Sequence, residues 1–163
     1  MSTGKALAAE LQYESKGTRK ILERIPEDKF GWKPHEKSMT VNRLGMHIAE
    51  LPLWINRTLE SNEFVFGKEP FKPNIPNTSQ EIMDEFEVRL AAALDALNKA
   101  DDDLMNTEWK VYFKETLISS SPKKVAIRNL INHIIHHRGQ LSVFLRLLDV
   151  PLPNLYGPTA DER

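Results

Sequence analysis

Three of the five histidines, His133, His136 and His137, fall within one apolar run between Val125 and Val150. Residues four apart on a helix lie on the same face one turn above each other, so the imidazoles of His133 and His137 can bind one divalent ion. At about 100° per residue, His137 lies about 30° and His133 about 70° from the centre of the apolar face, whereas His136 lies about 130° away. We therefore expect the first two to point inward and His136 to lie at the margin.

A second predicted helix offers a third imidazole. His47 lies on an apolar stripe, at a position similar to that of His133 on its own helix. The apolar members of the stripe are Leu44, Ile48, Leu51 and Ile55. A His-x-x-x-His pair alone is also typical of histidines buried in a protein core, and spacing alone leaves that interpretation open. His47 makes a three-histidine site a candidate.

Composition limits the classes of protein to consider. The 163 residues are 40% hydrophobic, enough to bury one sizeable core, and we expect a single domain over residues 1–163. The 22 basic and 23 acidic residues give a formal net charge of −1, which argues against nucleic acid as a partner. The absence of cysteine excludes disulfides, thiolate metal ligands and a cysteine nucleophile. Without a signal peptide or an apolar run of bilayer length, the sequence predicts a cytoplasmic protein and no membrane partner.

The elements that must position the histidines follow from helical periodicity. Apolar residues predict a first helix over about Leu7–Ile25, followed by a loop whose rings, Phe30 and Trp32, pack on the end of a bundle. The second helix, which carries the stripe, begins after Thr40 as N-cap. Pro52 removes a backbone donor inside this helix and predicts a kink there.

The second half of the bundle begins after a long connection, Gly67–Pro76, that shows no regular periodicity. Thr78 and Glu81 form a capping box, which opens a third helix that continues to about Leu97. The acidic run Asp101–Asp103 follows. Three adjacent side chains fan around the backbone, so we interpret this run as a solvated loop and not as a cation site.

The last part of the chain is predicted to be mostly one long helix. Trp109–Ile118 alternates weakly, which indicates a short strand or hairpin arm. Ser121 as cap and Pro122 at the first helical position predict the start of a fourth helix that reaches about Asp149. The tail, Asn154–Arg163, either packs back on the bundle or frays. These elements predict an all-α four-helix bundle with a long connection between helices two and three.

Three further residues are candidates for a role near the histidines. Glu50, one turn from His47, is a candidate catalytic base or ligand partner, or else an exposed glutamate without a role. Gln140, one turn beyond His137, is a second catalytic candidate that could orient a ligand, or it simply covers the edge of the core. Trp54 lines a substrate pocket or belongs to the core.

Several of these features occur together in a known family. The sequence resembles the DinB-like (DinB/YfiT) family of four-helix-bundle metalloproteins in Thr40 followed by His47, in the motif His-x-x-x-His-Arg-Gly-Gln-Leu from His133 to Leu141, and in the ending from Tyr156 to Glu162. The resemblance extends over most of the chain and is most specific in the fourth helix. It implies a divalent metal ion held by three histidines, which correspond to His47, His133 and His137.

The family contains thiol S-transferases that use low-molecular-weight thiols such as bacillithiol or mycothiol, together with many members without an assigned reaction. Three neutral imidazoles would leave a zinc or nickel ion with open positions, as in a catalytic site. A bound thiol would become a thiolate there, which would supply the nucleophile that a chain without cysteine lacks.

Two classes of function are compatible with the sequence. The first is a metal-dependent enzyme that transfers a thiol to a small electrophile, or hydrolyses it, in a pocket between the second and fourth helices. We expect its apolar walls to come from Leu44, Leu51, Trp54 and Phe144. The second is a binding or stability module in which the metal braces the bundle and the chain serves as a homodimer subunit or small-ligand carrier.

Overall fold

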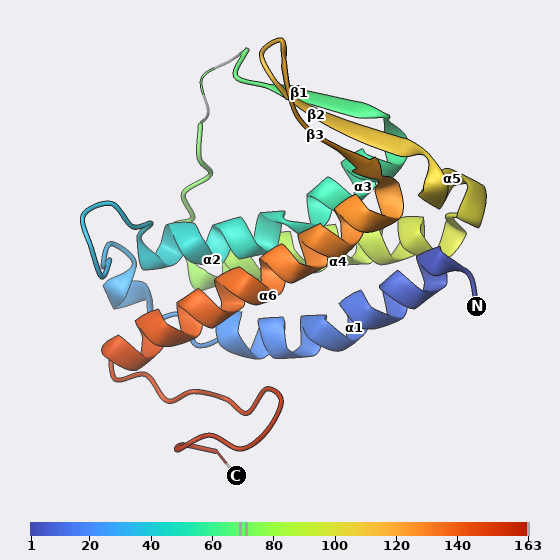
Figure 1. Ribbon diagram of the computed structural model, residues 1–163. Coiled ribbons are helices and arrows are strands. Elements are labelled where there is room, and N and C mark those ends of the chain that lie inside the picture. The colour runs from blue at the N-terminus through green and yellow to red at the C-terminus, as the bar shows by residue number, and fades with distance from the viewer. Residues whose placement is uncertain (69, 71, 163) are drawn as a thin grey trace.

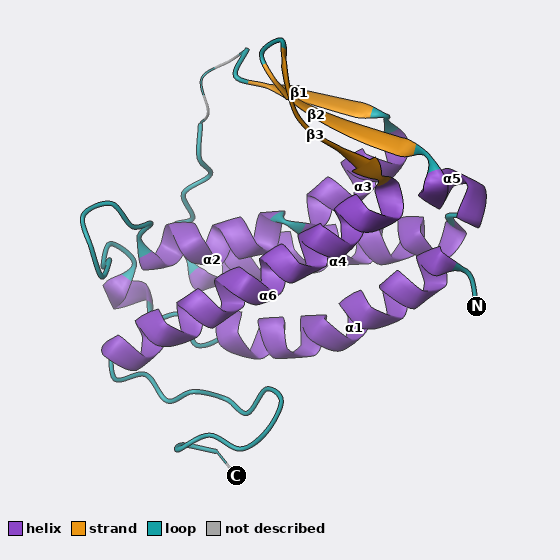
Figure 2. Ribbon diagram, viewed as in Figure 1, coloured by secondary structure: helices purple, strands orange, loops and turns teal. Residues whose placement is uncertain are grey.

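Four helical segments run along one another in the computed structural model, which describes residues 1–68, 70 and 72–162 (Figure 1). The four segments are α1 (Thr3–Leu22), the consecutive pair α2 (Val41–Glu50) and α3 (Pro52–Glu60), α4 (Ser79–Lys99) and α6 (Lys123–Leu147). The predicted four-helix bundle is therefore confirmed. Figure 2 shows in addition a small sheet over one end of the bundle.

The core explains why these amphipathic segments pack together. Buried apolar side chains from every long helix form one cluster, to which α4 contributes Ile82, Phe86 and Leu97. Transferring such side chains out of water contributes about 1.5–3 kcal/mol each. The rings of Phe30 and Trp32 pack against this cluster from the loop after α1, as predicted, and Trp32 meets Phe144 edge to face at 5.7 Å.

The predicted capping box of α4 is present. The hydroxyl of Thr78 accepts a hydrogen bond from the backbone N–H of Glu81 at 3.2 Å. The Glu81 carboxylate accepts one in return from the N–H of Asn77 at 2.8 Å, one residue earlier than in the usual box. Thr40 occupies the N-cap position of α2, but its hydroxyl donates to the Asn42 side chain at 2.7 Å and forms no cap hydrogen bond.

Pro52 divides the second helical segment, as predicted. It is the first residue of α3, and Leu51 forms the joint with α2. Pro52 has no N–H with which to continue the hydrogen bonds of α2, so the helix is interrupted one turn after His47. The interruption separates the segment that carries His47 from the segment that carries Trp54 and Arg57.

A three-stranded sheet extends the bundle beyond the predicted helices. Its strands are β1 (Glu63–Phe66), β2 (Glu108–Phe113) and β3 (Thr116–Pro122), in the order β1-β2-β3. β1 pairs with β2 in parallel, and β2 pairs with β3 as a hairpin. The weak alternation around Trp109 thus marks a real hairpin, whereas β1 was not predicted.

Two predicted boundaries are wrong. Ser121 does not cap the last helix, because it belongs to β3 and pairs with Trp109. Pro122 occupies the N-cap position of α6 and not its first turn, since the strand pairing continues to that residue. The acidic run is also not a plain loop: Asp101 caps the short helix α5 (Asp102–Asn106) by accepting a hydrogen bond from the N–H of Leu104 at 2.8 Å.

The long connection and the C-terminal tail, the two segments predicted to be least regular, differ in structure. The connection predicted over Gly67–Pro76 contains no helix or strand at its described positions, while Glu69 and Phe71 lie outside the described residues. The tail packs back on the bundle, where Glu162 pairs with Arg24 at 2.5 Å and Asp161 pairs with Arg146. Within the described part of the chain, no helix has both the length and the apolar character needed to cross a bilayer.

Candidate metal centre

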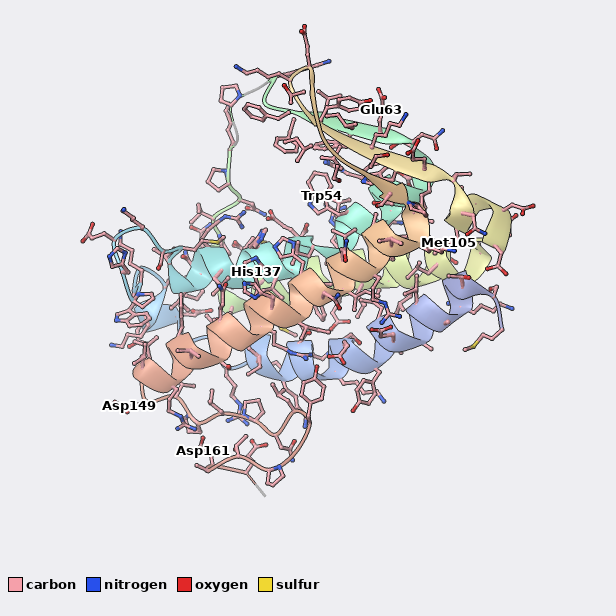
Figure 3. All side chains as sticks on the ribbon, in the orientation of Figure 1. Trp54, Glu63, Met105, His137, Asp149 and Asp161 are labelled. Atoms are coloured by element: carbon pink, nitrogen blue, oxygen red, sulfur yellow. The ribbon has the colours of Figure 1, made fainter. Side chains whose placement is uncertain are left out.

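The structure brings together the three predicted ligands. His47 comes from α2, and His133 and His137 come from consecutive turns of α6. One nitrogen from each ring can be chosen so that all three lie within 4.8 Å of one another. The ring centroids are separated by 5.5 Å for His47 and His133, 4.7 Å for His47 and His137, and 4.5 Å for His133 and His137. Figure 3 shows His137 between α2 and α6.

Burial of the surrounding helix faces aims these rings inward. On α2, Leu44 and Ile48 are almost fully buried on either side of His47. On α6, Ile134 and Leu141 are buried in the same way, and His137 itself is 9% exposed. The helical direction predicted for His137 therefore agrees with the packing, whereas His133 is less buried and lines the larger pocket. His136 is exposed, with its ring centroid 5.1 Å from that of His137, and it does not join the cluster.

The environment keeps the three imidazoles neutral. Burial, followed by the unfavourable electrostatic effect of a protonated His137 and of Arg43, lowers the pKa of His47 to about 4. Burial is also the main reason that the pKa values of His133 and His137 are lowered. A neutral imidazole has the lone pair that a metal ion requires. The three rings are thus in the binding form at neutral pH.

The closest contact inside the cluster joins the Nε2 atoms of His133 and His137 at 2.7 Å. One of these nitrogens must carry a proton for this contact to be a hydrogen bond. When both rings carry their protons on Nδ1, both Nε2 lone pairs are free, and a divalent cation could be held by them in place of the shared proton. The donor set therefore fits a metal ion, and it contains the nitrogen ligands typical of zinc and nickel.

Gln140 lies where it can fix the orientation of a ligand. Its Oε1 is 2.7 Å from Nδ1 of His137, so the ring N–H donates to the amide oxygen. With the proton held on Nδ1, the lone pair of His137 is on Nε2, which faces the other two rings. Of the two interpretations of Gln140, this contact favours the orienting role over simple coverage of the core.

Glu50 does not belong to the cluster. Its carboxylate accepts a hydrogen bond from the Arg43 guanidinium at 3.1 Å, and its side chain is 24% exposed. The described residues contain no other group of three or more histidines and carboxylates that could hold a metal ion, and no carboxylate joins the three imidazoles. A metal ion bound there would keep positions open for other ligands.

A pocket of about 1200 Å³ begins at the cluster and extends between the bundle and the sheet. His47 and His133 line one end, Leu51 and Trp54 form part of the helical wall, and the sheet supplies the opposite wall. The sheet residues in this lining include Phe64, Phe66, Trp109, Val111 and Phe113. The sequence interpretation missed the contribution of β1, because the apolar run Phe64–Phe66 is too short to distinguish a strand from a helix segment.

A smaller pocket of about 420 Å³ lies on the other side of the cluster. It is lined by His137 and Gln140, together with Leu44 and Phe144. The four apolar residues expected to surround one substrate pocket are therefore divided, with Leu51 and Trp54 lining the larger pocket. The cluster therefore borders both pockets, with His47 and His133 lining the larger one and His137 the smaller one.

The fold and the site define a four-helix-bundle protein with a three-histidine cluster that could hold a metal ion. The model of the DinB family matches residues 1–163, and the chain belongs to the DinB family. The family resemblance drawn from the sequence is confirmed.

Individual relatives agree with this assignment. The chain is 23% identical over 156 residues to the uncharacterized protein YrdA of Bacillus subtilis (strain 168), covering 93% of this chain and 86% of that protein. The crystal structure of a DinB-like protein from Bacillus cereus ATCC 10987 matches with a TM-score of 0.72 and 22% identity, over 92% of this chain and 95% of the other. A DinB-like protein, YjoA, from Bacillus subtilis matches with a TM-score of 0.67 and 18% identity, over 97% and 99%. At these identities the structural matches establish the fold.

Proposed function

We propose that this protein is a metal-dependent enzyme that joins a low-molecular-weight thiol to a small electrophile. One observation carries the proposal: three neutral imidazoles form a cluster without a fourth protein ligand among the described residues, and two of them, His47 and His133, line a large and mainly apolar pocket. A structural metal site is usually closed by protein ligands, whereas a catalytic site keeps a position for substrate. Membership of the DinB family supports metal binding.

Each part of the site has a defined task under this proposal. His47, His133 and His137 would hold a zinc or nickel ion, and Gln140 would keep His137 in the tautomer that binds. The ion would stabilise a thiolate over the thiol at neutral pH. Leu51 and Trp54 would exclude water and hold the electrophile near the thiol. The thiol must come from a second substrate, since the chain contains no cysteine.

Hydrolysis is the alternative use of the same open position, with water in the place of the thiol. A non-catalytic role is the other alternative, because ligands from α2 and α6 would also brace these two helices. The large apolar pocket beside the cluster favours a reaction with a small molecule over bracing alone.

The test uses protein purified without a histidine tag and loaded with zinc or nickel. A chlorinated dinitrobenzene is assayed with a panel of small thiols, and a nitrophenyl ester without thiol measures hydrolysis. The His137→Ala variant is the test variant, and His35→Ala, at an exposed loop position, is the matched control. We expect thiol transfer that depends on metal and on His137 but not on His35. Equal rates for wild type and His137→Ala with every thiol would overturn the proposal, and ester cleavage alone would favour the hydrolase.

A further inference from the structure

The described residues that line the larger pocket carry an unbalanced charge. Arg57, Lys68 and Lys72 contribute to the lining, and no aspartate or glutamate among the described residues does so. The chain as a whole is nearly neutral, so this excess is a local property of the pocket. Cationic groups beside low-dielectric apolar walls attract an anionic ligand more strongly than they would in open solvent.

Arg57 is held in a geometry that suits a carboxylate. Its guanidinium carbon lies 4.8 Å from the ring centroid of Trp54 and 5.7 Å from that of Phe64. The two rings contact each other edge to face at 4.7 Å, which fixes the surface on which the guanidinium rests. The planar guanidinium packs on aromatic faces while its N–H groups remain available in its own plane. Across the described residues, no carboxylate lies within ion-pair distance of Arg57.

The positions of Arg57 and His47 along the chain give the scale of the ligand. At a rise of about 1.5 Å per residue, the step from His47 to Arg57 is at most about 15 Å along α2 and α3, since the interruption at Pro52 can only shorten it. Aromatic rings extend across the sheet wall of the same pocket, since Phe66 contacts both Phe64, at 6.1 Å, and Phe113, at 5.6 Å. An apolar body bound against these rings would share one pocket with the histidines and with Arg57.

We propose that the pocket selects small molecules with an apolar or aromatic body and a carboxylate, and that Arg57 binds the carboxylate, with Lys68 and Lys72 adding attraction. The inference rests on the proposed function for what happens at the histidine end, where the reacting atom would lie. Arg57 is a specificity-determining residue here and takes no part in the reaction. The carboxylate can belong to the electrophile or to the thiol.

Binding is tested with two probes of the same shape, 4-phenylbutyrate and its uncharged amide. Calorimetric titration gives the affinity, and quenching of tryptophan fluorescence reports occupancy because Trp54 and Trp109 both line the pocket. Each probe is titrated into metal-loaded protein, metal-free protein and the variants Arg57→Met, Lys68→Gln and Lys72→Gln. Arg89→Met is the matched control, because Arg89 pairs with Glu85 on α4 and does not line the pocket.

We expect wild type to prefer the carboxylate, with or without metal. Arg57→Met should weaken carboxylate binding about tenfold and amide binding less than twofold, because methionine keeps an apolar stem on Trp54 but loses the charged donors. All three cations are exposed and screened, but Lys68 and Lys72 have a single flexible ammonium group instead of a guanidinium packed on aromatic rings, so each lysine variant should weaken it only about twofold. Equal binding of acid and amide to wild type would overturn the inference. A similar loss of affinity for the acid and the amide in Arg57→Met would also overturn the inference, because Arg57 would then contribute packing and not binding of the carboxylate.

Two further arms separate this inference from the proposed function. A carboxylate preference that disappears when the metal is removed would overturn the Arg57 assignment, because the carboxylate would then be bound by the metal. If the protein transfers no thiol but still prefers the carboxylate probe over the amide, the carboxylate site is supported and the proposed reaction is not. If the protein is active, KM is measured for wild type and Arg57→Met with a neutral and a carboxylated thiol. The same pair of measurements is made with a neutral and a carboxylated electrophile. The substrate that carries the carboxylate shows the larger rise in KM.

Discussion

Gln140 offers the sharpest test of how the site is organised. The perturbation is Gln140→Leu, which removes the oxygen that lies 2.7 Å from Nδ1 of His137 and leaves the three candidate ligands in place. Without that acceptor, the proton of the His137 ring is no longer held on Nδ1. A tautomer with the proton on Nε2 directs no lone pair toward His47 and His133. Metal binding then has to restore the correct tautomer and ring orientation.

The size of the effect follows from the position of the side chain. Loss of such a hydrogen-bond partner of a metal ligand typically weakens metal affinity by about 10- to 100-fold. Gln140 is exposed, and water can partly replace its oxygen. We therefore expect metal affinity to fall by the lower end of this range, about tenfold, which corresponds to about 1.4 kcal/mol of binding free energy. The number of metal ions bound at saturation should stay unchanged. Global stability should change by less than about 1 kcal/mol, because an exposed hydrogen bond contributes little.

The assay is competition for zinc against a chromophoric chelator of known affinity, with metal content and helix content measured in parallel. Gln140→Glu is the informative companion, since a carboxylate accepts the same hydrogen bond more strongly and should keep or raise the affinity. Gln12→Leu, an exposed position on α1, controls for adding a leucine to the surface. Unchanged affinity in Gln140→Leu would refute the reasoning. The same loss in Gln140→Glu would refute it as well, since the acceptor would then be irrelevant.

Three other predictions concern the histidines and the tail. Single replacement of His47, His133 or His137 by Ala should sharply reduce metal content, and full stoichiometric metal in all three variants by elemental analysis would contradict the ligand assignment. The pKa values of the three histidines are lowered in the folded protein, so near pH 5 the unfolded protein binds protons that the folded protein does not. The free energy of unfolding of the metal-free protein should therefore be highest above about pH 6.5 and should fall toward pH 4. His47, whose pKa is about 4, should account for a loss of about 1–2 kcal/mol in the free energy of unfolding after allowance for screening. The unfolding midpoint is measured as a function of pH, and a midpoint that does not change with pH would contradict this prediction. Arg138→Met should lower the free energy of unfolding by about 3–5 kcal/mol, because it leaves the Glu14 carboxylate buried without its cation. A decrease of less than about 5 °C in the thermal unfolding midpoint would contradict this.

The bundle and the histidine cluster could be predicted because both depend on helical periodicity. Apolar residues that recur on one face identify each long helix, and the same count gives the directions of His133 and His137. The packing of α2 against α6 then brings His47 to them. The direction of Gln140 also follows from its place one turn after His137, although only the structure shows the hydrogen bond.

The sheet could not be predicted in the same way. β1 is four residues long, and an apolar run of that length does not distinguish a strand from a helix segment. Its partner, β2, lies far along the chain, so the parallel pairing depends on tertiary packing and leaves no local pattern. The same pairing explains the misplaced start of α6: Ser121 and Pro122 have the residue types of a helix start, yet the ladder with β2 extends through both.

The motif around His137 joins the site to the tail through one stretch of helix. Residues adjacent on a helix point about 100° apart, so His137 faces α2 while Arg138 faces α1. Arg138 donates to the Glu14 carboxylate at 2.7 Å and to the Glu14 carbonyl at 2.8 Å, and it also donates to the hydroxyl of Tyr156. The tail therefore holds a second face of α6, about 100° from the cluster, against α1. Because α6 is thus fixed on both sides, His133 and His137 are positioned before any ligand binds, and less conformational entropy has to be lost when it does.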